Sequence, residues 1–133
     1  MTGTVVDSNV LLDVLSRDPI WMEWSAKALE ETADETPLII NPVIYAEVSY
    51  RYSRKEDLEA ALPSVLQREP IPYDAAFLAA KAHAIYRRRR GVKLSPLPDF
   101  FIGAHAAVRG YSLLTRDPAR YRSYFPTVKL IAP

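Results

Sequence analysis

Short apolar runs alternate along the chain with segments in which apolar residues recur at helical spacing. The short runs predict five strands, at residues 2–6 (TGTVV), 37–40 (PLII), 69–73 (EPIPY), 111–115 (YSLLT) and 128–133 (VKLIAP). The third run contains two prolines, which cannot donate a hydrogen bond to a neighbouring strand. We therefore expect it at an edge of the sheet.

The helical segments begin with residues that favour helix caps. They are predicted after Ser8 or Asn9, over 17–31 with Asp18 as N-cap, over 41–52 with Asn41 as N-cap, from a capping box at Ser53 to Glu56 up to about Val65, over 74–90 with Gly91 as the stop, over 99–108 after the loop SPLP, and as a turn at 117–125. Strands that alternate with helices indicate an α/β protein, an open α/β/α sandwich around a mainly parallel sheet of about five strands.

The composition agrees with a single domain over residues 1–133, because 49% of the residues are apolar and can fill one core. The net charge of +1 gives no reason to expect a protein that coats nucleic acid. No cysteine is present, which excludes disulfides and cysteine-ligated zinc, and no apolar run is long enough to cross a membrane. We expect a cytoplasmic protein with no membrane association.

Four carboxylates follow or accompany the predicted strand ends. Asp7 ends the first strand, Glu47 lies in the helix after the second, Asp99 begins the helix DFFIGAHAAV, and Asp117 follows the strand YSLLT. Ligands of parallel α/β sheets bind at the carboxyl ends of the strands, where loops and helix starts converge. All four carboxylates are therefore predicted to lie at one edge of the sheet.

Each aspartate also has a purely structural interpretation. Asp99 and Asp117 suit helix N-caps, and Asp7 suits an Asx-turn. Glu47 does not fit such a role, because its helical neighbours Val43, Ile44 and Tyr50 are apolar and a carboxylate among them needs a partner.

Carboxylates gathered at one site repel each other, by roughly 4 kcal/mol per pair at 4 Å and an effective dielectric of 20. No lysine or histidine is obviously placed among them, and hard divalent cations prefer carboxylate oxygen. We therefore predict a Mg²⁺ site, which Mn²⁺ can also fill, with Asp7, Asp99 and Asp117 as ligands. Glu47 would hold a metal-bound water or serve as a further ligand.

The segments VVDSNVLLD, YAEV, LPDFFIGAHA and LLTRDPARYRSYFP resemble, in order and spacing, the PIN-domain nucleases, and among them the VapC-type toxins of bacterial toxin–antitoxin pairs. The resemblance implies a PIN-like fold with acidic catalytic residues at Asp7, Glu47, Asp99 and Asp117, supported by Asn9 and Thr115. It also implies metal-dependent cleavage of RNA, inhibition of translation, neutralisation by a VapB-like antitoxin, and a homodimer. One departure is that Ile102 and Gly103 stand where some relatives carry a further acidic residue.

Two other functions remain open at this point. The first is a PIN-like module that binds RNA or protein without cleaving. The second is a metal-dependent phosphatase or phosphotransfer receiver, which usually needs a basic residue near its aspartate, whereas none precedes Arg17.

Three further features have a structural and a functional interpretation. Arg87 to Arg90 surround their helix rather than line one face, so solvation at a helix end is favoured over RNA binding. His83 and His105 lack ligand-like spacing and are expected to be structural. Ile20, Trp21, Trp24 and Ala28 form an apolar stripe that suits either the core or a groove for the antitoxin.

Overall fold

Five short strands form one parallel sheet in a computed structural model that describes residues 2–90 and 97–133. The strands are β1 (Thr4–Val6), β2 (Leu38–Ile40), β3 (Gln67–Arg68), β4 (Ser112–Leu114) and β5 (Leu130–Ile131). Their order across the sheet is β3-β2-β1-β4-β5, and every neighbouring pair is parallel. This confirms the predicted parallel sheet and places β1 at its centre.

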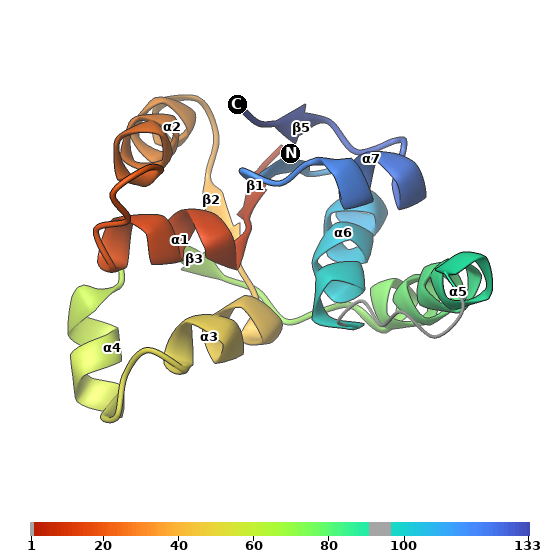
Figure 1. The fold of residues 1–133 in the computed structure, drawn as a ribbon, viewed down its shortest axis with the longest axis horizontal. Coiled ribbons are helices and arrows are strands. Elements are labelled where there is room, and N and C mark those ends of the chain that lie inside the picture. The colour runs from red at the N-terminus through yellow and green to blue at the C-terminus, as the bar shows by residue number, and fades with distance from the viewer. Residues whose placement is uncertain (1, 91–96) are drawn as a thin grey trace.

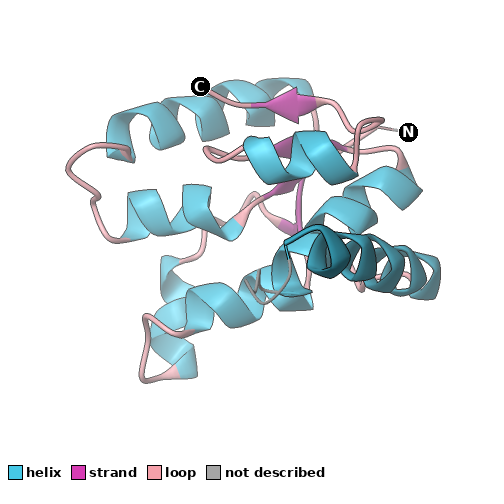
Figure 2. Ribbon diagram, turned by 45° about the vertical axis from the view of Figure 1, so that its right-hand side comes forward, coloured by secondary structure: helices cyan, strands magenta, loops and turns pink. Residues whose placement is uncertain are grey.

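Helices make up most of the remaining chain and lie on both sides of the strands (Figures 1 and 2). They are α1 (Ser8–Leu15), α2 (Met22–Glu35), α3 (Pro42–Ser49), α4 (Lys55–Ala61), α5 (Tyr73–Arg90), α6 (Leu97–Arg109) and α7 (Ala119–Tyr124). Among the described residues, no helix is both long and apolar enough to cross a membrane. The predicted stop of α5 at Gly91 lies outside the described residues.

The centre of the sheet is fully buried. Val5 and Val6 in β1, and Leu113 and Leu114 in β4, have no exposed surface. Helices cover both faces, so the last two residues of each of these strands are both apolar rather than alternating with a polar one. The polar residues Asp7 and Thr115 follow directly, at the edge that carries the site.

The third strand was predicted too far along the chain. It consists of Gln67 and Arg68 instead of residues 69–73, and its last hydrogen bond to β2 joins the Glu69 N–H to the Ile40 carbonyl at 3.0 Å. The prolines at 70 and 72 have no N–H group and so cannot extend the strand. The predicted edge position of this strand is confirmed, because β3 pairs only with β2.

Among the first four predicted helix starts, one was right and three were wrong. Asn41 caps α3, accepting a hydrogen bond from the Ile44 N–H at 3.0 Å. The first helix begins at Ser8 itself, so its N-cap position is Asp7. Asp18 accepts hydrogen bonds in a turn before α2, whose N-cap position is Trp21. The capping box at Ser53 does not form, because the N-cap position of α4 is Arg54, and that helix already ends at Ala61, ahead of Pro63.

Candidate active site

Three aspartates that are distant in sequence line one small pocket at the carboxyl edge of the sheet. The pocket has a volume of about 90 Å³ and is lined by Asp7, Ser8, Asn9, Asp99, Asp117, Arg120 and Tyr121. These residues come from the junction of β1 with α1, the start of α6, and the segment from the end of β4 into α7. The predicted convergence of Asp7, Asp99 and Asp117 is therefore present in the structure.

Asp7 is the most firmly held of the three aspartates. Its side chain is buried, and its Oδ2 accepts hydrogen bonds from the hydroxyls of Thr115 and Tyr121, both at 2.9 Å. Burial raises the pKa of Asp7, although these two hydrogen bonds act to lower it. Asp7 occupies the N-cap position of α1, yet its side chain makes no capping hydrogen bond, so its carboxylate faces the pocket rather than the helix end.

Glu47 is joined to Asp7 through Ser8. The Ser8 hydroxyl donates to Glu47 Oε1 at 2.7 Å and lies 3.5 Å from Asp7 Oδ1. Burial raises the pKa of Glu47, and the negative charges of Asp99 and Asp7 raise it further. The partner that Glu47 was expected to need is thus a serine hydroxyl. The sequence analysis considered Ser8 only as a helix cap.

Asp99 is paired with Arg120, which the sequence analysis did not consider. An Nη of Arg120 donates to Asp99 Oδ2 and forms an ion pair with it. The N-cap interpretation of Asp99 is wrong, because α6 begins two residues earlier, at Leu97, and Asp99 lies in its first turn. Burial raises the pKa of Asp99 even though Arg120 acts to lower it. The guanidinium therefore offsets the cost of burying this carboxylate only in part.

Asp117 is the exposed member of the group, and its backbone is fixed by the residues predicted to support the site. The Thr115 hydroxyl accepts hydrogen bonds from the Asp117 N–H at 3.1 Å and from Asn9 Nδ2 at 3.3 Å. The N-cap interpretation of Asp117 is wrong as well, since Pro118 occupies that position of α7. Thr115 thus connects Asp7, Asn9 and Asp117 through one hydroxyl group.

An ion pair between a buried carboxylate and a partly exposed arginine lies next to the pocket, and the sequence analysis did not predict it. Arg116 Nε donates to both carboxylate oxygens of Asp13, at 3.1 and 2.8 Å, and the Ser25 hydroxyl donates to the same carboxylate at 2.8 Å. Arg116 also lies over the ring of Trp21, at 5.6 Å from its centroid. This network ties α1, α2 and the loop that carries Asp117 together. The sequence offers no signal for it, because Asp13 and Arg116 are 103 residues apart.

The donor set suits a hard divalent cation by its chemistry, since the pocket presents three carboxylates and one cation. Burial raises the pKa of Asp7, of Glu47 and of Asp99, which is the behaviour of carboxylates that lack sufficient positive charge. Within residues 2–90 and 97–133, however, no group of three or more His, Cys, Asp or Glu side chains is close enough to hold a metal ion. Arg120 supplies the positive charge in this arrangement.

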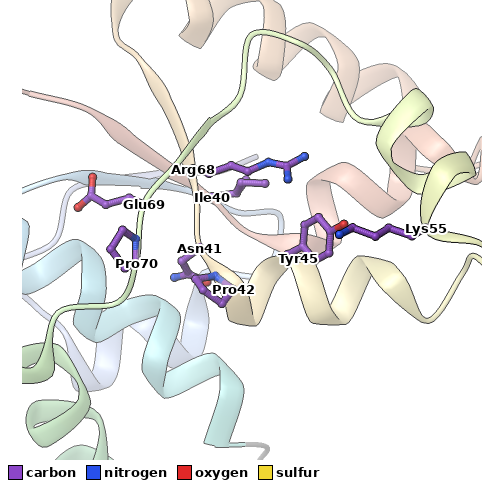
Figure 3. Close-up of a pocket in the computed structure, with 8 residues that line it drawn as sticks. All are labelled: Ile40, Asn41, Pro42, Tyr45, Lys55, Arg68, Glu69 and Pro70. Atoms are coloured by element: carbon purple, nitrogen blue, oxygen red, sulfur yellow. The ribbon is translucent and has the colours of Figure 1, made fainter.

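A second pocket, of about 380 Å³, lies on α3, α4 and the ends of β2 and β3 (Figure 3). Its acidic residue, Glu69, is already engaged by Tyr111 at 2.8 Å and Arg109 at 2.9 Å. Arg68 is held by Glu59 through two hydrogen bonds. With Glu69 and Arg68 paired in this way, and Lys55 as the other charged residue of the described lining, the pocket offers no cluster of described residues for acid–base or metal chemistry.

The histidines are placed as structural residues. His105 is fully buried, with Nδ1 2.9 Å from Asn41 Nδ2 and Nε2 3.2 Å from Glu69 Oε1. Since Asn41 Nδ2 is a donor, His105 carries its proton on Nε2. His83 packs edge-on against Phe100, with the ring centroids 5.2 Å apart. Neither residue lines the pocket of the aspartates.

The described side chains of the arginine cluster lie at the surface, whereas the apolar stripe lies partly in the core. Arg87 to Arg89 are exposed, and Arg89 lies over the ring of Tyr124 at 5.6 Å, while the Arg90 side chain lies outside the described part. In the stripe, Ala28 is buried and Trp24 packs against the core, whereas Ile20 is 77% exposed and precedes α2.

Comparisons with known proteins agree with this fold. The family model of the PIN domain matches residues 4–125. The chain is similar to the VapBC2 structure from Rickettsia felis bound to a promoter DNA fragment, with 18% identity, a TM-score of 0.73, and coverage of 99% of this chain and 98% of that one. A toxin–antitoxin complex from Klebsiella pneumoniae has 24% identity and a TM-score of 0.64, and 95% of each chain is covered.

A third similar structure is the VapC toxin of Mycobacterium tuberculosis that cleaves the sarcin–ricin loop. It has 15% identity and a TM-score of 0.64, with coverage of 96% of this chain and 99% of that one. No curated protein sequence matches the chain. The structural similarities concern the fold, whereas the family model spans most of the sequence from Thr4 in β1 to Phe125 after α7. The chain belongs to the PIN domain family.

Proposed function

We propose that this protein is a divalent-metal-dependent endoribonuclease that acts as the toxin of a toxin–antitoxin pair. One observation carries the proposal: the buried Asp7 carboxylate, held by Thr115 and Tyr121, lines the same small pocket as Asp99 and Asp117. A helix cap or turn would not require three such carboxylates to converge. This class of activity is supported by two similar structures, one of a toxin–antitoxin complex and one of a toxin that cleaves the sarcin–ricin loop.

Asp7, Asp99 and Asp117 would hold the metal, with Mg²⁺ or Mn²⁺ suiting their oxygens. When bound, such an ion neutralises charge on the phosphate and lowers the pKa of water. Asp7 is the best oriented of the three, because two hydroxyls bond its Oδ2 at 2.9 Å, while Oδ1 has only a 3.5 Å contact with the Ser8 hydroxyl. Thr115 and Asn9 fix the turn that carries Asp117.

Glu47 is the residue we assign to the attacking water. Its pKa is raised by burial and by the neighbouring carboxylates, which makes it a better proton acceptor than an ordinary glutamate. The Ser8 hydroxyl holds Glu47 Oε1 and so orients the carboxylate. Attack of water in line with the leaving oxygen would yield a 5′-phosphate and a 3′-hydroxyl, in keeping with PIN-domain chemistry.

The partners we propose are an RNA substrate, a VapB-like antitoxin and a second copy of the chain, all in the cytoplasm. The exposed Ile20 beside Trp21 supports an antitoxin surface at the start of α2. Tyr73 and Phe77 are 94% and 66% exposed and lie four residues apart on α5, which supports a dimer surface there. Analytical ultracentrifugation of the wild type and of Phe77→Glu tests the dimer.

Cleavage of total RNA by the purified protein tests the proposed activity. We expect cleavage with Mg²⁺ or Mn²⁺, none with EDTA, and little with Ca²⁺, whose looser coordination positions water and phosphate poorly. Sequencing the new 5′-phosphate ends identifies the target. Asp99→Asn serves as the inactive control, because it keeps the shape of the side chain and removes its charge.

Four results would contradict the proposal. Cleavage that persists in EDTA, or that is equal in the Asp99→Asn control, rules out a metal-dependent reaction at this pocket. RNA binding without cleavage under all these conditions identifies instead a PIN-like binding module. Transfer of phosphate from acetyl phosphate to Asp7 would identify a phosphotransfer receiver.

A further inference from the structure

Among the described residues that line the aspartate pocket, Arg120 is the one basic residue. It stands on α7 directly before Tyr121, whose hydroxyl is bonded to Asp7 at 2.9 Å. The backbone at Arg120 is therefore anchored to the centre of the site by its neighbour. The Arg120 side chain is itself 35% exposed, so its backbone is anchored while part of the side chain reaches solvent.

The pairing of Arg120 with Asp99 is exchangeable. Ion pairs that remain partly exposed contribute little net stability, and the exposed fractions here are 35% for Arg120 and 23% for Asp99. A divalent cation carries twice the charge of a guanidinium and attracts the same carboxylate more strongly. Asp99 can thus leave Arg120 for a metal.

Arg120 is suited to bind phosphate once it has been released. A guanidinium stays protonated and presents a planar fork that matches phosphate oxygens. Its guanidinium carbon lies 5.9 Å from the centroid of the Tyr86 ring. An uncharged aromatic face therefore contacts the side chain without forming an ion pair with it. An RNA phosphate that approaches Asp7 and Asp117 meets negative charge, and Arg120 is the cation at hand to offset it.

We propose that Arg120 is a substrate-binding residue that pairs with Asp99 until a divalent cation binds, and then pairs with the RNA phosphate. The proposal rests on the proposed metal-dependent ribonuclease function. It assigns two linked properties to one side chain. Arg120 competes with the metal for Asp99 when RNA is absent, and it contributes to RNA binding when metal is present.

Calorimetric titration of the purified protein with MnCl₂, without RNA, measures the first property. We expect Arg120→Met to bind Mn²⁺ about 3- to 10-fold more tightly than the wild type, because Asp99 is then free. Arg122→Met is the matched control, since Arg122 lies two residues further along α7, is exposed and does not line the pocket. The control should bind Mn²⁺ within about twofold of the wild type.

Fluorescence anisotropy with a labelled 20-nucleotide uridine RNA in CaCl₂ measures the second property. We expect Arg120→Met to bind this RNA about tenfold more weakly than Arg122→Met, because both lose one positive charge but only Arg120 lines the pocket. Arg120→Lys provides a second variant that retains the charge. It should bind Mn²⁺ like the wild type and RNA more weakly than the wild type, because lysine lacks the planar fork.

The Mn²⁺ and RNA titrations of these variants either support or overturn the proposal. Tighter Mn²⁺ binding together with weaker RNA binding in Arg120→Met supports the proposal. Mn²⁺ affinity in Arg120→Met that equals or falls below that of the wild type overturns the exchange, and RNA affinity equal to that of Arg122→Met overturns the phosphate contact. If the wild type and all variants fail to bind Mn²⁺, both this proposal and the metal-dependent function are wrong.

Discussion

Arg116 Nε donates two hydrogen bonds to the buried carboxylate of Asp13, at 3.1 and 2.8 Å, and so fastens the loop before Asp117 to the first helix. Because the Asp13 carboxylate is buried and Arg116 is only 31% exposed, the two partners should be energetically coupled. We expect Asp13→Asn and Arg116→Met each to lower the free energy of unfolding by about 1–3 kcal/mol. Urea unfolding of both single variants and of the double variant gives the coupling energy, which should exceed about 0.5 kcal/mol. If the changes in the free energy of unfolding of the two single variants add up to that of the double variant, the two residues are not coupled.

Asp7→Asn should abolish cleavage and stabilise the metal-free protein at pH 7, on the order of 1 kcal/mol, because it removes a buried charge and keeps an oxygen that can accept both hydrogen bonds. The pKa of Asp7 is raised on folding, so the folded wild type binds more protons than the unfolded chain between the ordinary pKa of 3.8 and the raised one. Wild-type stability therefore falls as pH rises through this window.

The gain in stability of Asp7→Asn over the wild type should consequently be small below pH 4 and increase toward pH 7. Thermal melts in EDTA across this range measure it, with Asp34→Asn, an exposed carboxylate on α2, as the control. Added Mg²⁺ should raise the midpoint of the wild type and leave that of Asp7→Asn nearly unchanged. A gain in stability that does not depend on pH would contradict the inference that the buried charge of Asp7 destabilises the metal-free protein.

Asp7→Glu tests whether this carboxylate binds the metal directly. The charge is kept, but the oxygens move by about one methylene, and a misplacement of about 1 Å can lower the rate about a hundredfold. Thr115 and Tyr121 fix the present position, so the longer side chain cannot easily relax into it. Cleavage rates at saturating Mg²⁺ provide the measurement. A rate equal to that of the wild type would mean that Asp7 is not a ligand.

Ile20→Glu should weaken binding of the cognate antitoxin about tenfold or more without affecting cleavage of RNA. Ile20 is 77% exposed, whereas Trp24 packs against the core, so Ile20 gives the cleaner test of the apolar stripe. Titration with the purified antitoxin measures the affinity. Val65→Glu, at another exposed apolar position, is the control, and equal affinity of both variants would place the antitoxin elsewhere.

Glu59 accepts hydrogen bonds from Arg68 and Tyr45, and the Arg68 guanidinium lowers the pKa of Glu59 to about 2. The folded chain therefore binds fewer protons than the unfolded chain below the ordinary pKa of 4.5. The contribution of Glu59 to the stability of the fold is present above pH 4.5 and is lost as pH falls toward 2. Thermal midpoints of the wild type and Glu59→Gln should differ near neutral pH and converge in acid. Glu30→Gln, an exposed site on α2, should show no such convergence.

The sequence alone determined the alternation of strands and helices, the parallel sheet and the edge at which Asp7, Asp99 and Asp117 meet. These features follow from local periodicity and from the rule that parallel strands deliver their carboxyl ends to one side. The resemblance of the acidic segments to PIN-domain nucleases agrees with the family match over residues 4–125. The bounds of individual elements were predicted less well where local signals compete. Examples are the start of α4 near Ser53 and the position of β3, which ends before the prolines.

Only the tertiary structure decided which side chains complete the site. Arg120 pairs with an aspartate 21 residues away, Tyr121 bonds Asp7 across 114 residues, and Arg116 reaches Asp13 across 103. Such contacts depend on how α7 and the loop before it pack against the sheet edge, and periodicity carries no information about that packing. A charge in a sequence shows neither its burial nor its partner, because both are set by the three-dimensional path of the chain.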